Sequence, residues 1–584
     1  MVRVVSAAGH PEVPTQSLEV HIGMLDALWS LSCKFRFEFI RLLGLLIIQI
    51  AVSFFSVVSI IPLSDIVLNP ESSSQHIVTK RLEEYLQPFG LEVGFLLCAS
   101  LFVFTNGLKA VSDLLTHYYI FRMKYVVHRV LSLELIGNLF GAKCTYLSSY
   151  TEGKIINTLN HEMTKVAESL CYIAQQMASV VQLVVFVSIP LTVSVELTLM
   201  SLLLAVIAAL PFFLLYKKSF VLGKLDTKTA NKYNEIISEI FYLRRLNKIQ
   251  SLEKYVTNTV GVAHEQHVKV ALPSQVLKAS ITYLYYPLAL AATLCAIGVY
   301  LEETSVAVIA IFLWSFVRAM PVIAKILQTN LNMLNFLPAY QQVYQINGYA
   351  KVNAELSGSK HFNVLQRAVS IKNLSFAYDE QQLILREANM EIEKGKITVL
   401  IGPSGSGKST IVDVLLGLRD VKQGQVLIDG INLRNFNTKS WRKKIGYVGQ
   451  DPQLRHMTIR DNLTFGLNEV SDDEISNALD RANAAEIVVK QKHGLQSVVG
   501  GVGGNLSGGE KQRLNIARAL LRSPEILIFD EATNQQDGES VEKIKQTIKN
   551  LSSELAILFI THQSDVLEIA DVVYRVEQNT LVRI

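Results

Sequence analysis

The chain has 584 residues, of which 50% are hydrophobic and 18% are charged, and its net charge at pH 7 is +4. This length allows two or more domains. The small net charge gives no support for a nucleic-acid partner, and none is expected. The five cysteines, Cys33, Cys98, Cys144, Cys171 and Cys295, include no C-x-x-C pair. They are interpreted as free thiols rather than as a metal site or a disulfide framework.

Residues 1–38 lack the charged start, apolar core and small-residue cleavage site of a removable signal peptide. We expect them to form a cytoplasmic segment leading to the membrane. Six apolar stretches follow, each close to the roughly 20 residues that a helix needs to cross the hydrocarbon. They are 42–61, 93–111, 177–195, 197–216, 283–300 and 306–322. The sequence therefore predicts a six-helix transmembrane domain over residues 39–328, whose third and fourth helices form a hairpin split at Glu196.

The charges on the connecting loops predict the orientation of these helices. Lys34, Arg36 and Arg41 precede the first stretch, and a run of Lys and Arg residues over 217–248 follows the fourth. The opposite loops are acidic or neutral. By the positive-inside rule both termini are cytoplasmic, and the protein is a multi-pass protein of the inner (plasma) membrane.

Basic residues also lie inside or beside the predicted helices. Arg318 is about two-thirds of the way through the sixth stretch, and Lys325 follows seven residues later on nearly the same helical face. Lys109 and Asp113 form an i, i+4 pair at the inner end of the second. These cations either snorkel to the cytoplasmic interface or face an aqueous cavity, where a guanidinium would bind phosphate or carboxylate. The second reading makes Arg318 and Lys325 candidate substrate-binding residues.

After a predicted linker over 329–364, residues 365–584 have the composition of an α/β domain. A β-type run over 396–401 leads into a glycine loop, and a helical segment that includes Thr410 follows it. The loop fits the pattern G-x-x-x-x-G-K-[ST], in which backbone N–H groups and a helix N-terminus hold phosphates. We expect Lys408 to contact the β- and γ-phosphates of ATP and the Ser409 hydroxyl to bind Mg²⁺. The loop reads Gly402-Pro403-Ser404-Gly405-Ser406-Gly407-Lys408-Ser409.

Three further strings follow the glycine loop. An apolar strand, 526–529, ends in Asp530 and Glu531, and Asp530 is expected to hold the Mg²⁺. His562 follows another apolar run. The remaining string, Leu506-Ser507-Gly508-Gly509-Glu510, precedes these two apolar runs in the chain.

In this order, behind a strongly apolar half, the strings resemble those of an ATP-binding-cassette (ABC) exporter half-transporter, from about residue 42 to the C-terminus. The resemblance implies an all-α six-helix transmembrane domain followed by an α/β P-loop NTPase cassette. It also implies ATP hydrolysis coupled to translocation, with ATP and Mg²⁺ as cofactors.

The same resemblance assigns roles to individual residues of the cassette. Glu531 polarises the attacking water, Gln450 senses Mg²⁺, and His562 contacts the γ-phosphate. Tyr378 stacks on adenine, and Asp537 is the aspartate that the family keeps after this glutamate. Ordinary structural roles, such as a core tyrosine at 378, are the alternatives.

In this family the signature residues Ser507, Gly508, Gly509 and Glu510 cap the nucleotide held by a second cassette. The resemblance therefore implies a dimer. Because every catalytic position is intact, a symmetric homodimer is the simplest case, and a heterodimer is the alternative. Residues 142–155 and 240–252 occupy the places of the coupling helices, with plain solvated helix as the alternative.

Two departures from the family pattern lie near the signature and the Walker B glutamate. Asn534-Gln535-Gln536 replaces Ser-Ala-Leu before Asp537, at the dimer seam, and Gly501 stands where exporters commonly have an acid. Both put coupling between copies in doubt, and neither touches ATP chemistry.

The substrate is expected to be an amphiphile, most simply a lipid or lipid-linked saccharide. This expectation rests on Arg318, on the lack of room for a peptidase domain, and on a stretch over 503–509 similar to that of oligosaccharide-lipid flippases. A peptide or multidrug exporter is one alternative. A non-transporting ATPase that regulates a membrane partner is the other.

Overall fold

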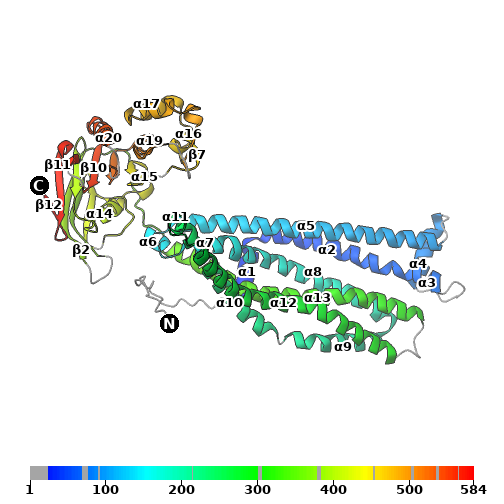
Figure 1. Cartoon of the computed structure of the whole chain (residues 1–584). Helices are drawn as coiled ribbons and strands as arrows, with labels where there is room; N and C mark the ends of the chain where they lie inside the picture. Colours follow the sequence, from blue (N-terminus) through cyan, green and yellow to red (C-terminus); the bar gives the residue numbers. More distant parts are fainter. Residues whose placement is uncertain are drawn as a thin grey trace, which may run out of the picture. The chain divides into compact units, whose positions relative to one another are not determined.

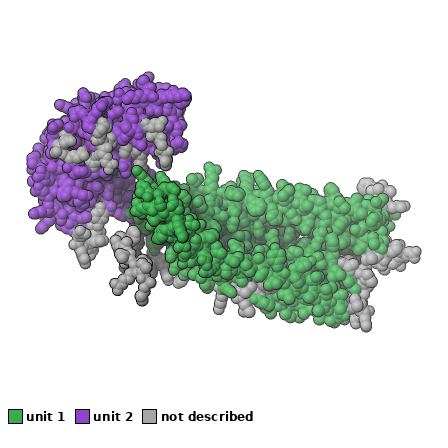
Figure 2. All heavy atoms as spheres, viewed as in Figure 1, with its two compact units in different colours: residues 1–142, 146–353 green, residues 143–145, 354–584 purple. Residues whose placement is uncertain are grey.

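The chain divides into two units, residues 1–142 with 146–353 and residues 143–145 with 354–584, coloured separately in Figure 2. The structure is a computed structural model. It describes residues 24–68, 77–89, 93–213, 215–299, 306–377, 383–421, 423–451, 454–500, 506–533, 538–562 and 565–584.

The first unit is helical in its described residues, and Figure 1 shows its longest helices, α5, α8, α12 and α13, running along one another. Its elements are α1 (Met24–Lys34), α2 (Arg36–Val58), α3 (Ile60–Leu68), α4 (Ile77–Leu86), η1 (Gln87–Phe89), α5 (Phe95–Gly141), α6 (Cys144–Leu147, whose first two residues belong to the second unit), α7 (Glu152–Asn157), the π-helical η2 (Thr158–Glu162), α8 (Met163–Val193), α9 (Val195–Phe213), α10 (Leu215–Tyr242), α11 (Arg244–Ile249), α12 (Glu253–Val299) and α13 (Val306–Val352).

Helix covers most of the described residues in the six predicted membrane stretches; the described exceptions are Ser59, residues 93–94 and Ser194. The first crosses from α2 into α3, the second begins α5, the third ends α8, the fourth covers α9 and the start of α10, the fifth ends α12 and the sixth begins α13. Among the described residues, three helical stretches are long and apolar enough to cross a membrane: Arg36–Val67, Phe95–Gly141 and Glu152–Ser188. Val195–Pro211 and Tyr283–Val299 are shorter apolar helices. The hairpin turns at Ser194, which has extended backbone, and not at Glu196, which lies in the first turn of α9.

Some polar side chains are buried inside this unit, and many apolar ones are exposed on its surface. α2 buries Gln49, Ser53 and Ser56, and α5 buries Ser112 and Thr116. The opposite side of α5 exposes a row of apolar side chains: Val103, Phe104, Leu108, Val111, Leu114 and Leu115. In water such a row would be costly, whereas against lipid it has no penalty.

The boundary between the units differs from the one expected from sequence. Residues 329–352, placed in a linker above, continue α13 as far as Val352. The reason is packing, since Leu331, Phe336, Val343 and Ile346 recur at helical spacing and are all buried. The connection to the first strand is therefore confined to residues 353–367.

The second unit contains two main sheets. The four-stranded sheet has the order β2-β1-β4-β5 and is antiparallel, and the six-stranded sheet has the order β12-β11-β3-β10-β9-β6, with only β12 antiparallel. The strands are β1 (Ala368–Ala377), β2 (Leu383–Glu393), β3 (Ile397–Ile401), β4 (Gln423–Ile428), β5 (Ile431–Asn432), β6 (Ile445–Val448), β9 (Ile526–Asp530), β10 (Ala556–Thr561), β11 (Val572–Glu577) and β12 (Thr580–Arg583), beside a small pair, β7 (Met457–Thr458) and β8 (Val498–Val499).

Helices cover the six-stranded sheet, so its strands are buried on both faces. In β10, Leu558 belongs to a core shared with α14 and the four-stranded sheet, whereas Phe559 belongs to a core shared with α19 and α20. This two-sided burial explains why β3, β9 and β10 read as continuous apolar runs. The helical elements are α14 (Lys408–Leu415), η3 (Leu433–Asn435), α15 (Thr438–Lys443), α16 (Ile459–Leu463), α17 (Asp472–Arg481), α18 (Ala485–Val489), η4 (Gly494–Gln496), α19 (Gly508–Leu520), α20 (Gly538–Leu551) and η5 (Asp565–Ile569).

Candidate functional site

The predicted catalytic groups meet at the carboxyl edge of the six-stranded sheet. β10 lies between β3 and β9, with Ile560 opposite both Leu400 and Asp530. Because the three strands are parallel, the segments that follow them emerge at the same edge. This places the glycine loop after β3, Glu531 after β9 and His562 after β10 next to one another.

The glycine loop has a backbone that only glycine adopts without strain. Gly405 and Gly407 have φ of +78° and +100°. A Cβ at Gly407 would lie 2.8 Å from Ile384 Cγ2. Immediately after this turn α14 begins at Lys408, so the N–H groups of its first turn have no partners within the helix. An anion binds well at such a helix N-terminus.

Lys408 is buried and folded over its own loop. Its Nζ donates to the carbonyl oxygens of Gly402 at 2.8 Å and Pro403 at 2.9 Å. The hydroxyl oxygen of Ser406 is also buried, and it has no hydrogen-bond partner in the described part of the chain. A phosphate would supply an acceptor for that hydroxyl, so the residues present fit the phosphate-binding role.

Asp530, at the end of β9, is paired with a residue to which the sequence analysis gave no role. The Tyr447 hydroxyl, on the neighbouring strand β6, donates to Asp530 Oδ2 at 3.0 Å. Burial raises the pKa of Asp530, and the hydrogen bond from Tyr447 lowers it. The missed signal is the position of Tyr447, which precedes Gly449 and Gln450 at the end of a strand parallel to β9.

Glu531 has a left-handed backbone, with φ of +52°. Its backbone N–H donates to the carbonyl oxygen of Ile560 at 2.9 Å, which holds this conformation against β10. Glu531 Oε1 lies 3.5 Å from Nδ1 of His562, and the glutamate side chain is less exposed than the histidine, at 23% against 53%. Left-handed backbone in a non-glycine residue costs about 1–3 kcal/mol and concentrates at functional sites.

Gln450 is exposed in the loop after β6. The carbonyl oxygen of its neighbour Gly449 accepts from Gln512 Nε2 of α19 at 3.1 Å, so this loop is tied to the signature helix. Ser409, Gln450 and Asp530 offer oxygen atoms, the donors that Mg²⁺ prefers. Among the described residues no group of three or more His, Cys, Asp or Glu side chains could hold a metal.

The signature residues begin a different element. Ser507 caps α19, its Oγ accepting from the Glu510 N–H at 3.2 Å while the Glu510 carboxylate accepts from the Ser507 N–H at 2.8 Å. Gly508 and Gly509 form the first turn of α19, which packs against β6 and α17. The structure thus places this string on a helix cap rather than in the glycine loop.

Several predicted residues lie outside the described part of the chain: Tyr378, Asp537, and the departures Asn534, Gln535, Gln536 and Gly501. Pro403 and Ser404 lie in the glycine loop, and Thr410 is buried in the first turn of α14. In the helical unit, Arg318 and Lys325 are half-buried on α13.

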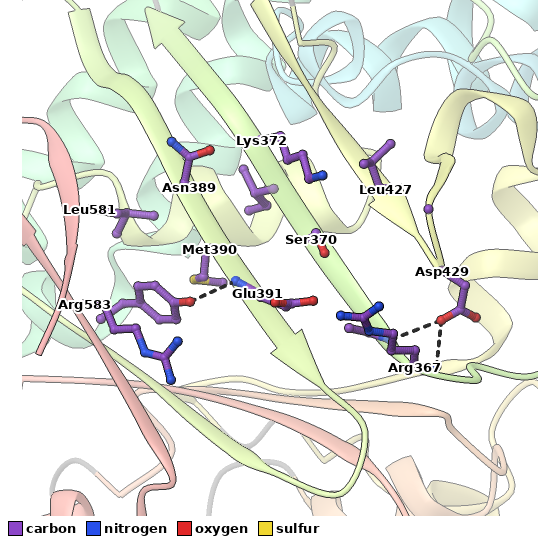
Figure 3. A pocket seen from close by; sticks show the side chains of 14 residues that line it. Arg367, Ser370, Lys372, Asn389, Met390, Glu391, Leu427, Asp429, Leu581 and Arg583 are labelled. Carbon is purple, nitrogen blue, oxygen red and sulfur yellow. Dashed lines mark hydrogen bonds between the residues drawn. The ribbon is translucent and has the colours of Figure 1, made fainter.

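A hollow of about 720 Å³ lies over the four-stranded sheet and β12, apart from the glycine loop (Figure 3). One of its acids, Asp429, accepts from the backbone N–H groups of Gln366, Arg367 and Ala368 at 2.7–3.1 Å. This carboxylate ties β4 to the start of β1. None of the predicted nucleotide-binding residues lines the hollow, so it is not part of the site.

Comparison with known proteins identifies the class. Residues 385–534 match the family model described as ABC transporter. A bacterial Atm1-family ABC exporter with ATP bound has the same fold, with a TM-score of 0.76, 19% identity, and coverage of 94% of this chain and 95% of that one. The predicted fold class, a helical membrane domain followed by an α/β cassette, is confirmed.

Among curated relatives, the heterocyst differentiation ATP-binding protein HepA of Nostoc sp. is 27% identical over 77% of this chain and 74% of its own. A multidrug resistance ABC transporter ATP-binding and permease protein of Lactococcus lactis is 28% identical over 75% of each chain. The ATP-dependent lipid A-core flippase of Pasteurella multocida is 39% identical over 39% of each. The chain is an ABC exporter half-transporter, and its enzymatic activity is the ATP hydrolysis of that class.

Proposed function

We propose that two copies of this chain form a symmetric exporter that uses ATP to move an amphiphile, a lipid or lipid-linked saccharide, across the inner (plasma) membrane. One observation carries the ATP part of the proposal. The glycine loop, Asp530, Glu531 and His562 converge at one sheet edge, in a chain whose other unit exposes apolar helix surfaces.

At that edge each residue has a proposed role. Residues 402–410 bind the phosphates, with Lys408 turning from its carbonyl partners to the β- and γ-phosphates. Tyr378 stacks on the base. Ser409, Gln450 and Asp530 would hold Mg²⁺, which would supply positive charge against the phosphates.

Glu531 is the proposed general base, which orients water and accepts its proton. Its Oε1 is within 3.5 Å of His562 Nδ1, so the imidazole restrains the carboxylate and remains near the γ-phosphate. The fixed left-handed backbone of Glu531 favours one carboxylate position, which is what a base needs in order to act on water.

The signature completes the site from the second copy. Ser507, Gly508, Gly509 and Glu510 cap the γ-phosphate held by the partner's glycine loop, and Asp537 lies at the same seam. ATP therefore favours the closed dimer, and hydrolysis releases it. Residues 142–155 and 240–252 act as coupling helices, with both termini in the cytoplasm.

The substrate class rests on the helical unit and on one relative. Arg318 offers a bidentate donor to phosphate or carboxylate, and the lipid A-core flippase shares 39% identity over its matched part. A multidrug exporter is the second candidate, because the Lactococcus lactis relative matches a larger share of the chain.

Reconstitution in proteoliposomes tests the proposal. We expect ATP-dependent flux and a higher ATPase rate with lipid-linked sugars or lipopolysaccharide cores than with peptides or hydrophobic drugs. Stimulation by drugs or peptides alone would favour the second class. ATP hydrolysis without any flux would instead indicate a regulatory ATPase.

A further inference from the structure

Three cations and one carboxylate lie on α5 and α13 at or beside the inner ends of two predicted membrane stretches. Lys109 and Asp113 are four residues apart on α5, and Arg318 and Lys325 are seven apart on α13, so each pair shares a helix face. All four are half-buried within the helical unit. The two helices contact each other.

Neutral groups hold Arg318 in place. Its Nη2 donates to Asn106 Oδ1 at 3.1 Å, and its Cζ lies 4.6 Å from the centroid of the Trp314 ring. Asn106 Oδ1 also accepts from the Ser56 hydroxyl at 2.9 Å. The guanidinium is therefore oriented without being neutralised.

Asp113 is the shared counter-ion of the cluster. Its carboxylate acts electrostatically on Lys109, Arg318 and Lys325, while Oδ1 accepts from Gln49 Nε2 at 2.5 Å. Within the described part of the chain none of the three cations forms an ion pair. Lys109 instead faces the Phe186 ring, with Nζ 5.6 Å from its centroid.

The charge of this cluster is unbalanced. Three cations against one carboxylate leave two positive charges in a part of the unit surrounded by apolar helix surface. A charge buried at membrane depth costs several kcal/mol unless it is paired or hydrated. Charges arranged in this way are stabilised by an anion that carries two negative charges.

Resting on the proposed function, we infer that Lys109, Arg318 and Lys325 form the headgroup site of the exported amphiphile, and that the site takes a doubly charged group such as a phosphate monoester. Arg318 binds two phosphate oxygens through parallel N–H donors, and the lysines add point charge. Asp113 is a positioning residue: it keeps the cations together between substrates and repels the incoming phosphate.

Trp314 provides the readout, because its ring contacts Arg318. The chain has three tryptophans. Trp441 is buried in the cassette and Trp29 is 73% exposed, so a Trp29→Phe background leaves Trp314 as the responsive fluorophore. The full chain in detergent at pH 8 is titrated with hexadecyl phosphate, with hexadecyl sulfate, which carries one charge less, and with inorganic phosphate.

We expect saturable quenching by hexadecyl phosphate and at least about tenfold weaker binding of hexadecyl sulfate, since the sulfate lacks one of the two negative charges that the cations attract. Arg318→Ala should weaken hexadecyl phosphate binding about tenfold or more, and Arg318→Lys by less. Asp113→Asn should tighten it. Lys269→Ala, which removes an exposed cation paired with Glu265, should change nothing.

Equal binding of the phosphate and the sulfate, or unchanged affinity in both Arg318→Ala and Asp113→Asn, would overturn the inference. Tight binding of inorganic phosphate alone would assign the site to a soluble anion and would also overturn the headgroup assignment. Lipid-stimulated flux without this charge dependence would overturn the headgroup site but would leave the proposed function intact. Charge-dependent binding without flux would remove the proposed function and leave an anion site.

Discussion

In the cassette, neighbouring residues Leu558 and Phe559 are buried on opposite faces of one sheet, whereas in the helical unit the buried positions of α2 and α5 include Gln49, Ser56 and Thr116. The first pattern suits a domain surrounded by water, and the second suits helices surrounded by lipid. The cassette therefore carries its chemistry at the edge of an apolar core. The helical unit buries several polar groups and exposes many apolar ones.

This difference decides where single substitutions act. The cassette gathers its reactive groups through strand register, so one change there removes a step of ATP hydrolysis. In the helical unit, Lys109, Arg318 and Lys325 share one counter-ion, Asp113. One change there therefore alters the affinity for a ligand and does not remove a reaction step.

Glu531→Gln should give the largest loss. Removing a general base lowers turnover by about 10²–10⁴-fold, while ATP binding remains because the glycine loop is intact. Steady-state hydrolysis and nucleotide binding by the purified chain measure the two separately. Glu539→Gln, which alters an exposed acid of α20, should behave as the unchanged chain. Normal turnover in Glu531→Gln would remove this residue from its role.

Gly407→Ala should weaken ATP binding about tenfold or more, because the new Cβ would meet Ile384 at 2.8 Å and the backbone φ of +100° is strained. Gly395→Ala is the matched control, since Gly395 has φ of +82° but nothing within 4 Å of the added Cβ. If both variants bind ATP equally well, the shape of the glycine loop is not what holds the phosphates.

Tyr447→Phe should shift the pH dependence of hydrolysis. The hydroxyl lowers the pKa of Asp530, which burial raises, so its removal raises that pKa further. As the pH falls, the carboxylate needed for Mg²⁺ is then protonated already at a higher pH. The acid limb of the pH–rate profile therefore moves to higher pH. Tyr574→Phe, which removes a hydroxyl bonded to the Glu391 N–H, should leave the limb in place. An unshifted limb in Tyr447→Phe would contradict the coupling.

Glu355→Gln should have the smallest effect. Glu355 accepts two hydrogen bonds from Arg442, at 2.8 and 3.0 Å, so the connection after α13 is fastened to the cassette. We expect a loss of about 1 kcal/mol in the unfolding free energy of the cassette, measured by denaturant unfolding of the full chain. Glu577→Gln, in the exposed pair with Arg575, should cost less. Equal costs would mean that the connection is not fastened there.

The cassette was predictable because its motifs are contiguous and its strands are apolar runs. Glu531 meets β10 because β9 and β10 are parallel neighbours in the sheet. The sequence alone does not specify that order of strands. Tyr447 was missed because a tyrosine in a strand ordinarily packs in a core. The apolar stretch alone does not predict the length of α13, because the rest of the helix is marked only by the spacing of Leu331, Phe336 and Val343. In the helical unit, the partners of Arg318 depend on helix packing, which periodicity does not specify.

One mixing experiment tests the central claim that ATP is held between two copies of the chain. Lys408→Ala disables the glycine loop. Ser507→Asp keeps a good helix cap and places a negative charge where the signature faces phosphate. Each variant alone should be inactive, and co-assembled mixtures should regain hydrolysis, because the intact loop of one copy meets the intact signature of the other. If the mixtures stay inactive while mixed dimers are present, or if Ser507→Asp hydrolyses ATP alone, the shared site does not exist.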